Sequence, residues 1–98
     1  MKLLIVEDEP ELLDTVVRYL QAQQYGCEVA TTYAQAQEKM LLYDYDCIIL
    51  DLTLPGGDGL NLLRSLQQLQ KSAGVIIASA RAAVDDRIAG LELGADDY

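Results

Sequence analysis

Carboxylate and hydroxyl side chains follow three apolar runs of the sequence, at the point where each run ends. Glu7 and Asp8 follow the run 2–6, Asp51 follows the run 47–50, and Ser79 follows the run 75–78. A buried parallel strand delivers the residue after it to the edge of its sheet, where ligands bind in such folds. We therefore expect these groups to meet at one site.

An acidic cluster of this kind suits a hard cation. Neighbouring carboxylates repel one another, so a protein that gathers them raises the pKa of one or supplies a positive charge, and all-oxygen donors favour Mg²⁺. We expect Asp8 to bind the ion directly, Glu7 to bind it directly or through water, and the backbone carbonyl of Thr53 to complete the shell. The alternative is a set of unrelated, solvated acids, with Asp51 capping the helix that follows it.

Phosphoryl transfer is a chemistry that such a site can perform. The Asp51 carboxylate is the candidate nucleophile toward phosphorus, because a divalent ion would neutralise the charges that keep it from a phosphoryl group. The Ser79 hydroxyl would then bond a phosphoryl oxygen. The chain contains no histidine, which excludes most triad chemistries.

The spacing of apolar residues predicts four strands that alternate with four helices. We expect the first helix over 9–24, with Pro10 in its first turn and Gly26 as its stop signal. Thr31 or Thr32 would cap the second helix. The apolar positions of the first helix are Leu12, Leu13, Val16, Val17 and Leu20. The predicted strands are 2–6, 27–30, a run that ends in Asp51, and 75–78. A third helix is expected after the Pro-Gly-Gly turn, and a fourth helix over 85–93.

This alternation predicts an α/β fold with a parallel sheet and helices on both faces, since parallel strands need right-handed crossovers. The 98 residues are enough for one domain, 1–98. The net charge of −9 argues against direct contact with nucleic acid or an anionic membrane. No apolar stretch is long enough to span a bilayer and no signal peptide is visible, so we expect a soluble, cytoplasmic domain. Cys27 and Cys47 are expected to be buried thiols.

The whole chain resembles the receiver domain of two-component response regulators. The matching segments, in order, are LLIVEDE (3–9), IILDLTLPGGDG (48–59), SAR (79–81) and GLELGADDY (90–98). The resemblance implies a flavodoxin-like, doubly wound sheet in which Mg²⁺ is held at Asp8, Asp51 and the Thr53 carbonyl. It also implies phosphoryl transfer to Asp51 from the phosphohistidine of a sensor histidine kinase. Ser79 matches the family's switch hydroxyl and Tyr98 its switch aromatic.

The segment around 86–98 is most similar to the OmpR/PhoB subgroup of winged-helix transcription factors. That resemblance implies homodimerisation through the fourth helix, fifth strand and fifth helix, where Arg87, Asp96 and Asp97 match salt-bridging positions. The alternative is that these three residues belong to a solvated helix end and have no role in an interface. A DNA-binding output domain would follow Tyr98 in that subgroup.

Receivers of this type continue past the switch aromatic into a Lys-Pro turn, a fifth strand and a fifth helix, which this sequence does not contain. We therefore expect strand order 2-1-3-4 and an exposed edge at the run 75–78 that promotes self-association. The family's lysine is not matched by Lys2, Lys39 or Lys71. Because that cation helps to neutralise the phosphoryl group, we expect inefficient phosphorylation of the 98-residue form.

Three other functions remain open at this point. A binding-only pseudo-receiver, or an inactive fragment, would keep the fold without phosphotransfer. A haloacid-dehalogenase-like, Mg²⁺-dependent phosphatase also uses an aspartyl-phosphate, but it expects a second acid where this chain has Thr53. An FMN carrier of the flavodoxin type expects a hydroxyl-rich first loop, whereas Glu7 and Asp8 would repel the phosphate of the ligand.

Overall fold

The computed structural model describes residues 1–69 and 73–77. The predictions for Ser79, Tyr98, Arg87, Asp96 and Asp97, and for a helix over 85–93, concern positions outside these described residues.

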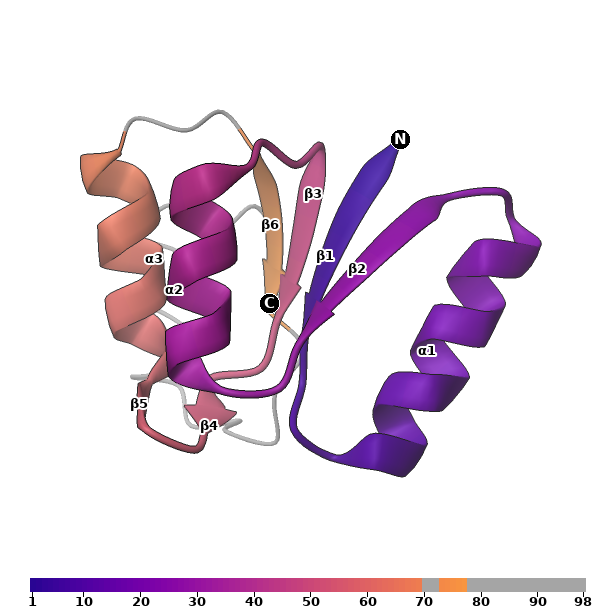
Figure 1. Cartoon of the computed structure of the whole chain (residues 1–98), viewed down its shortest axis with the longest axis horizontal. Coiled ribbons are helices and arrows are strands. Elements are labelled where there is room, and N and C mark those ends of the chain that lie inside the picture. The colour runs from indigo at the N-terminus through magenta and orange to yellow at the C-terminus, as the bar shows by residue number, and fades with distance from the viewer. Residues whose placement is uncertain (70–72, 78–98) are drawn as a thin grey trace.

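A four-stranded parallel sheet forms the centre of the described structure (Figure 1). Its strands lie in the order β2 (Gly26–Ala30), β1 (Lys2–Val6), β3 (Cys47–Leu50) and β6 (Gly74–Ile77). The predicted order 2-1-3-4 is confirmed, with β6 as the fourth main strand. The register pairs Leu3 with both Cys27 and Cys47, so the two thiols sit on strands separated by β1. Neither cysteine forms a disulfide, and both are half-buried where full burial was expected.

Helices cover the two faces of this sheet, as the alternating pattern predicts (Figure 1). Helix α1 (Pro10–Ala22) lies on one face, and helices α2 (Tyr33–Leu42) and α3 (Gly59–Gln68) lie side by side on the other. Pro10 opens α1 because its missing N–H is not needed at the first helical position. Thr32 caps α2, since its hydroxyl accepts a hydrogen bond from the Gln35 amide at 3.2 Å.

The main core lies between the sheet and the pair α2 and α3. Alternate residues of each strand point into it, because successive strand side chains face opposite sides of a sheet. Among those on β1, β3 and β6 are Leu4, Val6, Ile48, Leu50, Val75 and Ile77, each at most 2% exposed. The helices contribute Leu62 and Leu63 of α3 and Met40 of α2 to the same core. The carboxyl ends of β1 and β3 are therefore held in fixed positions.

Helix α1 is less buried than its apolar spacing predicts. None of its residues is buried, and Leu12 is 45% exposed, while the other apolar positions are half-buried. Its end also differs from the expectation, because Gly26 is the first residue of β2 and not the stop signal. Gln24 instead adopts the left-handed conformation, with φ of 68°, and turns the chain into the strand.

A short antiparallel hairpin follows Asp51 and was not predicted. Its strands are β4 (Thr53–Leu54) and β5 (Gly57–Asp58), and Pro55 and Gly56 connect them. Gly56 has φ of 94°, a value that favours glycine in such a turn. The hairpin leads directly into α3.

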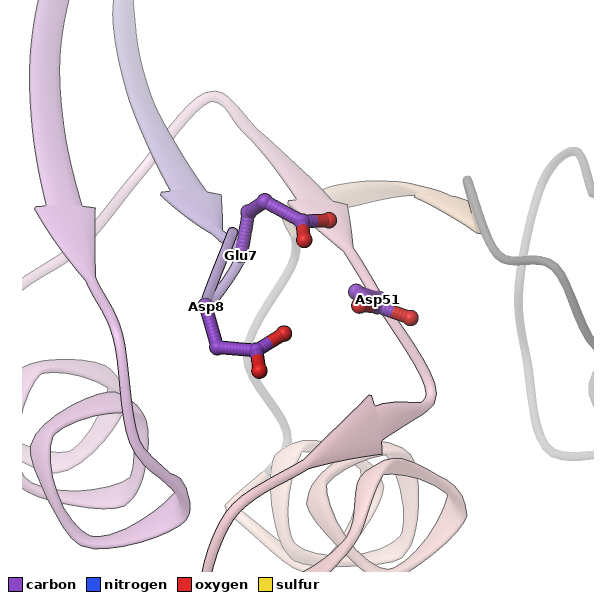
Figure 2. A group of neighbouring side chains, drawn as sticks. All are labelled: Glu7, Asp8 and Asp51. Carbon is purple, nitrogen blue, oxygen red and sulfur yellow. The ribbon is translucent and has the colours of Figure 1, made fainter. Parts of the chain in front are cut away.

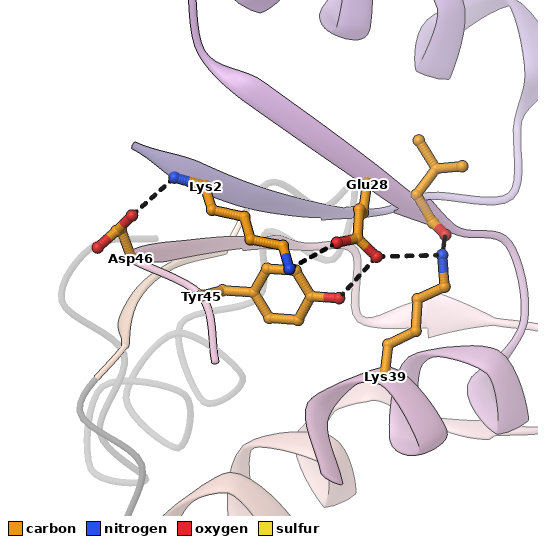
Figure 3. A network of polar contacts seen from close by, with 6 residues as sticks. Lys2, Glu28, Lys39, Tyr45 and Asp46 are labelled. Carbon is orange, nitrogen blue, oxygen red and sulfur yellow. Dashed lines mark hydrogen bonds and ion pairs between the residues drawn. The ribbon is translucent and has the colours of Figure 1, made fainter. Parts of the chain in front are cut away.

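A polar network joins the strands at the edge opposite their carboxyl ends (Figure 3). The Lys2 ammonium lies 2.9 Å from Glu28 Oε2, and the Tyr45 hydroxyl donates to Glu28 Oε1 at 3.2 Å. Lys39 of α2 lies 3.8 Å from Glu28 and donates to the Val29 carbonyl at 2.8 Å. The network thus ties α2 and the segment before β3 to the first two strands. In the part of the chain that the structure describes, no helix is long and apolar enough to cross a membrane.

Candidate metal and phosphoryl-acceptor site

Three carboxylates meet at the carboxyl ends of two neighbouring strands (Figure 2). Glu7 and Asp8 follow β1, and Asp51 follows β3, which is paired with β1. The register sets Val6 opposite Leu50, so the first residue beyond each strand lies at the same level. One carboxylate oxygen from each of the three acids lies within 4.8 Å of the others. The structure therefore brings Glu7, Asp8 and Asp51 together, as predicted.

Backbone hydrogen bonds hold two of these acids in place. The Asp51 amide donates to the Val6 carbonyl at 2.9 Å, and the Glu7 amide donates to the Ala30 carbonyl at 3.0 Å. The parallel pairing of the sheet thus extends one residue past the strands. Glu7 is 8% exposed and Asp51 9% exposed, whereas Asp8 is exposed. Two nearly buried carboxylates and one exposed carboxylate form the cluster.

The surroundings of Glu7 disfavour its charged form. Burial raises the pKa of Glu7 above its ordinary value, and the charge of Asp51 and a hydrogen bond with that carboxylate raise it further. The backbone amide of Glu9 acts in the opposite direction, since it donates to Glu7 Oε1 at 3.1 Å. The sequence could not predict this interaction, because every residue except proline has a backbone amide and residue type does not show which one donates.

The donor set fits a hard divalent cation. All the ligand atoms of the cluster are carboxylate oxygens, with no nitrogen or sulfur donor among them, and such sites favour Mg²⁺ or Ca²⁺. A cation would also relieve the repulsion that raises the pKa of Glu7. The same three side chains could present an accessible carboxylate oxygen to a phosphoryl group.

The loop after Asp51 is tightly packed against the strand that carries it. The Gly59 amide donates to the Leu52 carbonyl at 3.0 Å, and a Cβ at Gly59 would lie 2.6 Å from Leu52 Cα and 2.9 Å from the Asp51 carbonyl oxygen. Thr53, the predicted carbonyl ligand, begins β4 two residues beyond Asp51. The loop backbone is therefore held beside the acidic cluster.

Asp51 does not cap the helix that follows it. The N-cap of α3 is Asp58, whose carboxylate accepts a hydrogen bond from the Leu60 amide at 3.0 Å. This observation excludes the capping interpretation of Asp51. A metal site would explain why Asp51 is buried beside Glu7 and Asp8, whereas a helix cap would not.

Comparison with known protein families gives one match over nearly the whole length. A family described as "response regulator receiver domain" matches residues 3–98. Transcriptional regulatory protein BasR of Escherichia coli K12 is 41% identical over 98 residues, which cover 100% of this chain and 44% of BasR. The chain thus spans less than half the length of this curated relative. Such relatives are named as transcriptional regulators, which confirms the predicted kinship with the transcription-factor subgroup.

Solved structures agree with this match. The receiver domain of Klebsiella pneumoniae RstA, activated by BeF3, has a TM-score of 0.91 at 31% identity, with 100% of this chain and 83% of that chain covered. A response regulator from Burkholderia pseudomallei has a TM-score of 0.92 at 25% identity, with 99% and 57% covered. That protein was crystallised with a phosphorylated aspartic acid, a calcium ion and citrate. The fold of this chain is thus shared with these structures.

Proposed function

This chain belongs to the response regulator receiver domain family, and we propose that Asp51 accepts a phosphoryl group from the phosphohistidine of a sensor histidine kinase. The observation that supports this role most strongly is the meeting of Glu7, Asp8 and Asp51 within 4.8 Å at the carboxyl ends of β1 and β3. The Burkholderia relative with a phosphorylated aspartic acid and a calcium ion supports the same chemistry. Family membership favours a receiver over the phosphatase and the FMN carrier.

In the proposed reaction, a carboxylate oxygen of Asp51 forms a bond to phosphorus. The phosphorus–nitrogen bond of the phosphohistidine breaks, its electron pair stays on the imidazole nitrogen, and an acyl phosphate remains on Asp51. No general base is needed, since an ionised carboxylate already has the electron pair that attacks. The hydrogen bond from the Asp51 amide to the Val6 carbonyl fixes the backbone that carries the nucleophile.

The other residues of the cluster prepare the site for the incoming charge. We propose that Asp8, Glu7, Asp51 and the Thr53 carbonyl hold Mg²⁺, which neutralises negative charge between the carboxylate and the phosphoryl oxygens. The Glu9 amide orients Glu7 by donating to its Oε1. The protein would act as a phosphoacceptor with at most self-catalysed dephosphorylation, and not as an enzyme with an external substrate.

The consequence of phosphorylation is proposed from the family. Ser79 and Tyr98 match the switch hydroxyl and switch aromatic, and Arg87, Asp96 and Asp97 match the dimer interface. A phosphoryl group on Asp51 would then bias a two-state surface that controls a transcriptional output. The names of the curated relatives, of which this chain covers 44%, support an output of this kind.

The test is incubation with acetyl phosphate and Mg²⁺, with intact-mass analysis of the product. We expect a single added phosphoryl group that hydroxylamine removes, at low occupancy in the 98-residue wild type and in Asp14→Asn, and no label in Asp51→Asn. Asp14 is the matched control because it is an exposed aspartate on α1, paired with Arg18. The same comparison is made in a chimera in which Tyr98 is followed by the corresponding segment of BasR.

Two results would contradict the proposal. Label that persists in Asp51→Asn would show that another residue is the acceptor. If Mg²⁺ binds but neither the 98-residue chain nor the chimera becomes phosphorylated, the domain would instead be a binding-only pseudo-receiver.

A further inference from the structure

The first residue of α2 contacts the hairpin that follows Asp51. The Tyr33 amide donates to the Pro55 carbonyl at 3.1 Å, and its ring lies against Gly57. The two segments are more than twenty residues apart in sequence. Tyr33 is half-buried and packs against the main core, so its ring is enclosed between the core and the hairpin.

The ring occupies the space that a side chain at Gly57 would need. A Cβ at that position would lie 2.5 Å from Cδ2, 2.7 Å from Cγ and 2.9 Å from Cε2 of Tyr33. Such distances are not compatible with van der Waals contact. The backbone of Gly57 does not itself require glycine, because the left-handed conformation occurs at Gly56 and not at Gly57. The absence of a side chain at 57 is therefore explained by the ring of Tyr33.

Contacts outside the hairpin also determine the position of Tyr33. Thr32 caps α2, and Gln35 Oε1 accepts a hydrogen bond from the Thr31 amide at 2.9 Å, which joins β2 to the first turn of the helix. Ala36 and Met40 anchor the same helix in the main core. The ring thus presents a fixed surface to Gly57.

The hairpin transmits this contact to the acidic cluster. Gly57 of β5 pairs with Leu54 of β4, and Asp58 pairs with Thr53, two residues beyond Asp51. The Gly59 amide closes the loop on the Leu52 carbonyl. A displacement of Gly57 would therefore move the backbone at Thr53, which carries the carbonyl proposed as a metal ligand.

We propose that Tyr33 is a positioning residue for the acceptor loop, whose ring, seated on Gly57, holds the hairpin 53–58 and so fixes the backbone next to the metal site. This inference rests on the function proposed above. It assigns a role to a side chain that neither touches the phosphoryl group nor belongs to the acidic cluster.

The experiment measures Mg²⁺ affinity of the full chain by isothermal titration calorimetry, with thermal unfolding recorded for each variant. Tyr33→Ala removes the ring but keeps the amide, and we expect it to weaken Mg²⁺ binding by roughly tenfold, as for other residues that orient metal ligands. Tyr33→Phe keeps the ring and should retain the wild-type affinity. Tyr19→Ala is the matched control, because Tyr19 is 67% exposed on α1.

Gly57→Ala tests the same contact from the other side. We expect this variant to weaken Mg²⁺ binding, because its methyl group displaces the hairpin from the ring. In the double variant Tyr33→Ala with Gly57→Ala, the methyl group at position 57 would occupy the space that the ring of Tyr33 fills in the wild type. The affinity of the double variant should therefore equal that of Tyr33→Ala, and the two effects should not add.

Each outcome distinguishes this inference from the proposed function. If Asp51→Asn binds Mg²⁺ as the wild type does, the proposed site is wrong. If Asp51→Asn loses binding while Tyr33→Ala or Gly57→Ala retains it, the site stands and the positioning role is overturned. Should Tyr33→Ala unfold at the assay temperature, Gly57→Ala and Tyr33→Leu supply the same comparison, and wild-type affinity in both would overturn the role.

Discussion

The backbone amide of Asp51 donates a hydrogen bond to the carbonyl of Val6, the residue that precedes Glu7, at 2.9 Å. This bond joins the ends of β1 and β3 and sets Asp51 level with Glu7. The proximity of the two backbone positions that carry these acids is therefore a property of the sheet pairing. The predictions below follow from this and neighbouring contacts.

Replacing Glu7 by glutamine should stabilise the fold and weaken the metal site. The pKa of Glu7 is raised by burial first and by Asp51 second, so the folded state carries an unfavourable charge at neutral pH. Without divalent cations at pH 7, Glu7→Gln should raise the free energy of unfolding by roughly 0.5–2 kcal/mol. Its Mg²⁺ affinity should fall roughly tenfold.

The pH dependence gives the sign of this effect. Below the ordinary pKa of 4.5, Glu7 is protonated in both states and the variant should match the wild type. The advantage of Glu7→Gln should grow as pH rises above 4.5 and should be complete once pH exceeds the raised, folded-state pKa. Urea unfolding across this range measures it, and Glu9→Gln, which removes an exposed neighbouring charge, is the control. A variant less stable than the wild type at pH 7 would contradict the prediction.

Gly59→Ala should disturb the acceptor loop. Its Cβ would meet the backbone of Leu52 at 2.6 Å and the Asp51 carbonyl oxygen at 2.9 Å, and backbone atoms cannot move aside as a side-chain tip can. We expect a loss of about 1–3 kcal/mol in stability, together with slower labelling of Asp51 by acetyl phosphate. Gly26→Ala is the control, since its Cβ would lie 3.7 Å from the nearest atom, the Met1 carbonyl oxygen. Equal stability of the two variants would contradict this prediction.

Glu28→Gln should weaken the network at the opposite edge of the sheet in a pH-dependent way. The pKa of Glu28 is lowered, chiefly by its hydrogen bond with Lys2 and further by Tyr45 and Lys39. Its contribution to stability is thus present above pH 4.5 and disappears as pH falls through the lowered, folded-state pKa.

At pH 7 the expected loss for Glu28→Gln is about 0.5–1 kcal/mol, because the pair with Lys2 is partly solvated. Chemical denaturation at pH 7 and at acidic pH provides the comparison. Glu38→Gln, an exposed glutamate on α2, is the control and should show little change. A difference between wild type and Glu28→Gln that persists undiminished in acid would refute the assignment.

Gln24→Gly should stabilise the turn between α1 and β2. Gln24 has φ of 68°, a conformation that strains residues with a Cβ and that glycine adopts freely. We expect a gain of roughly 0.5–1 kcal/mol in the free energy of unfolding. Gln23→Gly, at a neighbouring position with φ of −87°, should instead be neutral or destabilising. Denaturant unfolding of both variants tests the contrast.

The main strands and helices and the acids of the site could be predicted from residue types and spacing alone. Apolar runs that end in Glu7 and Asp51 mark buried parallel strands, because only such strands are apolar on both faces. The resemblance to the family then predicted the strand order and the residues proposed to hold the metal. Apolar runs and motif residues are local features of the sequence, so they can be recognised without knowledge of the packing.

The contacts between side chains from different elements became known from the folded chain. It showed that Asp58, and not Asp51, caps α3, and that Gln24, and not Gly26, turns the chain after α1. It also placed the ring of Tyr33 on Gly57. Contacts of this kind depend on how α2 and the hairpin pack over one core, and residue type and spacing along the chain do not encode that distance. The acids were visible in the sequence, whereas the contacts that hold their loop in place became visible only in the folded chain.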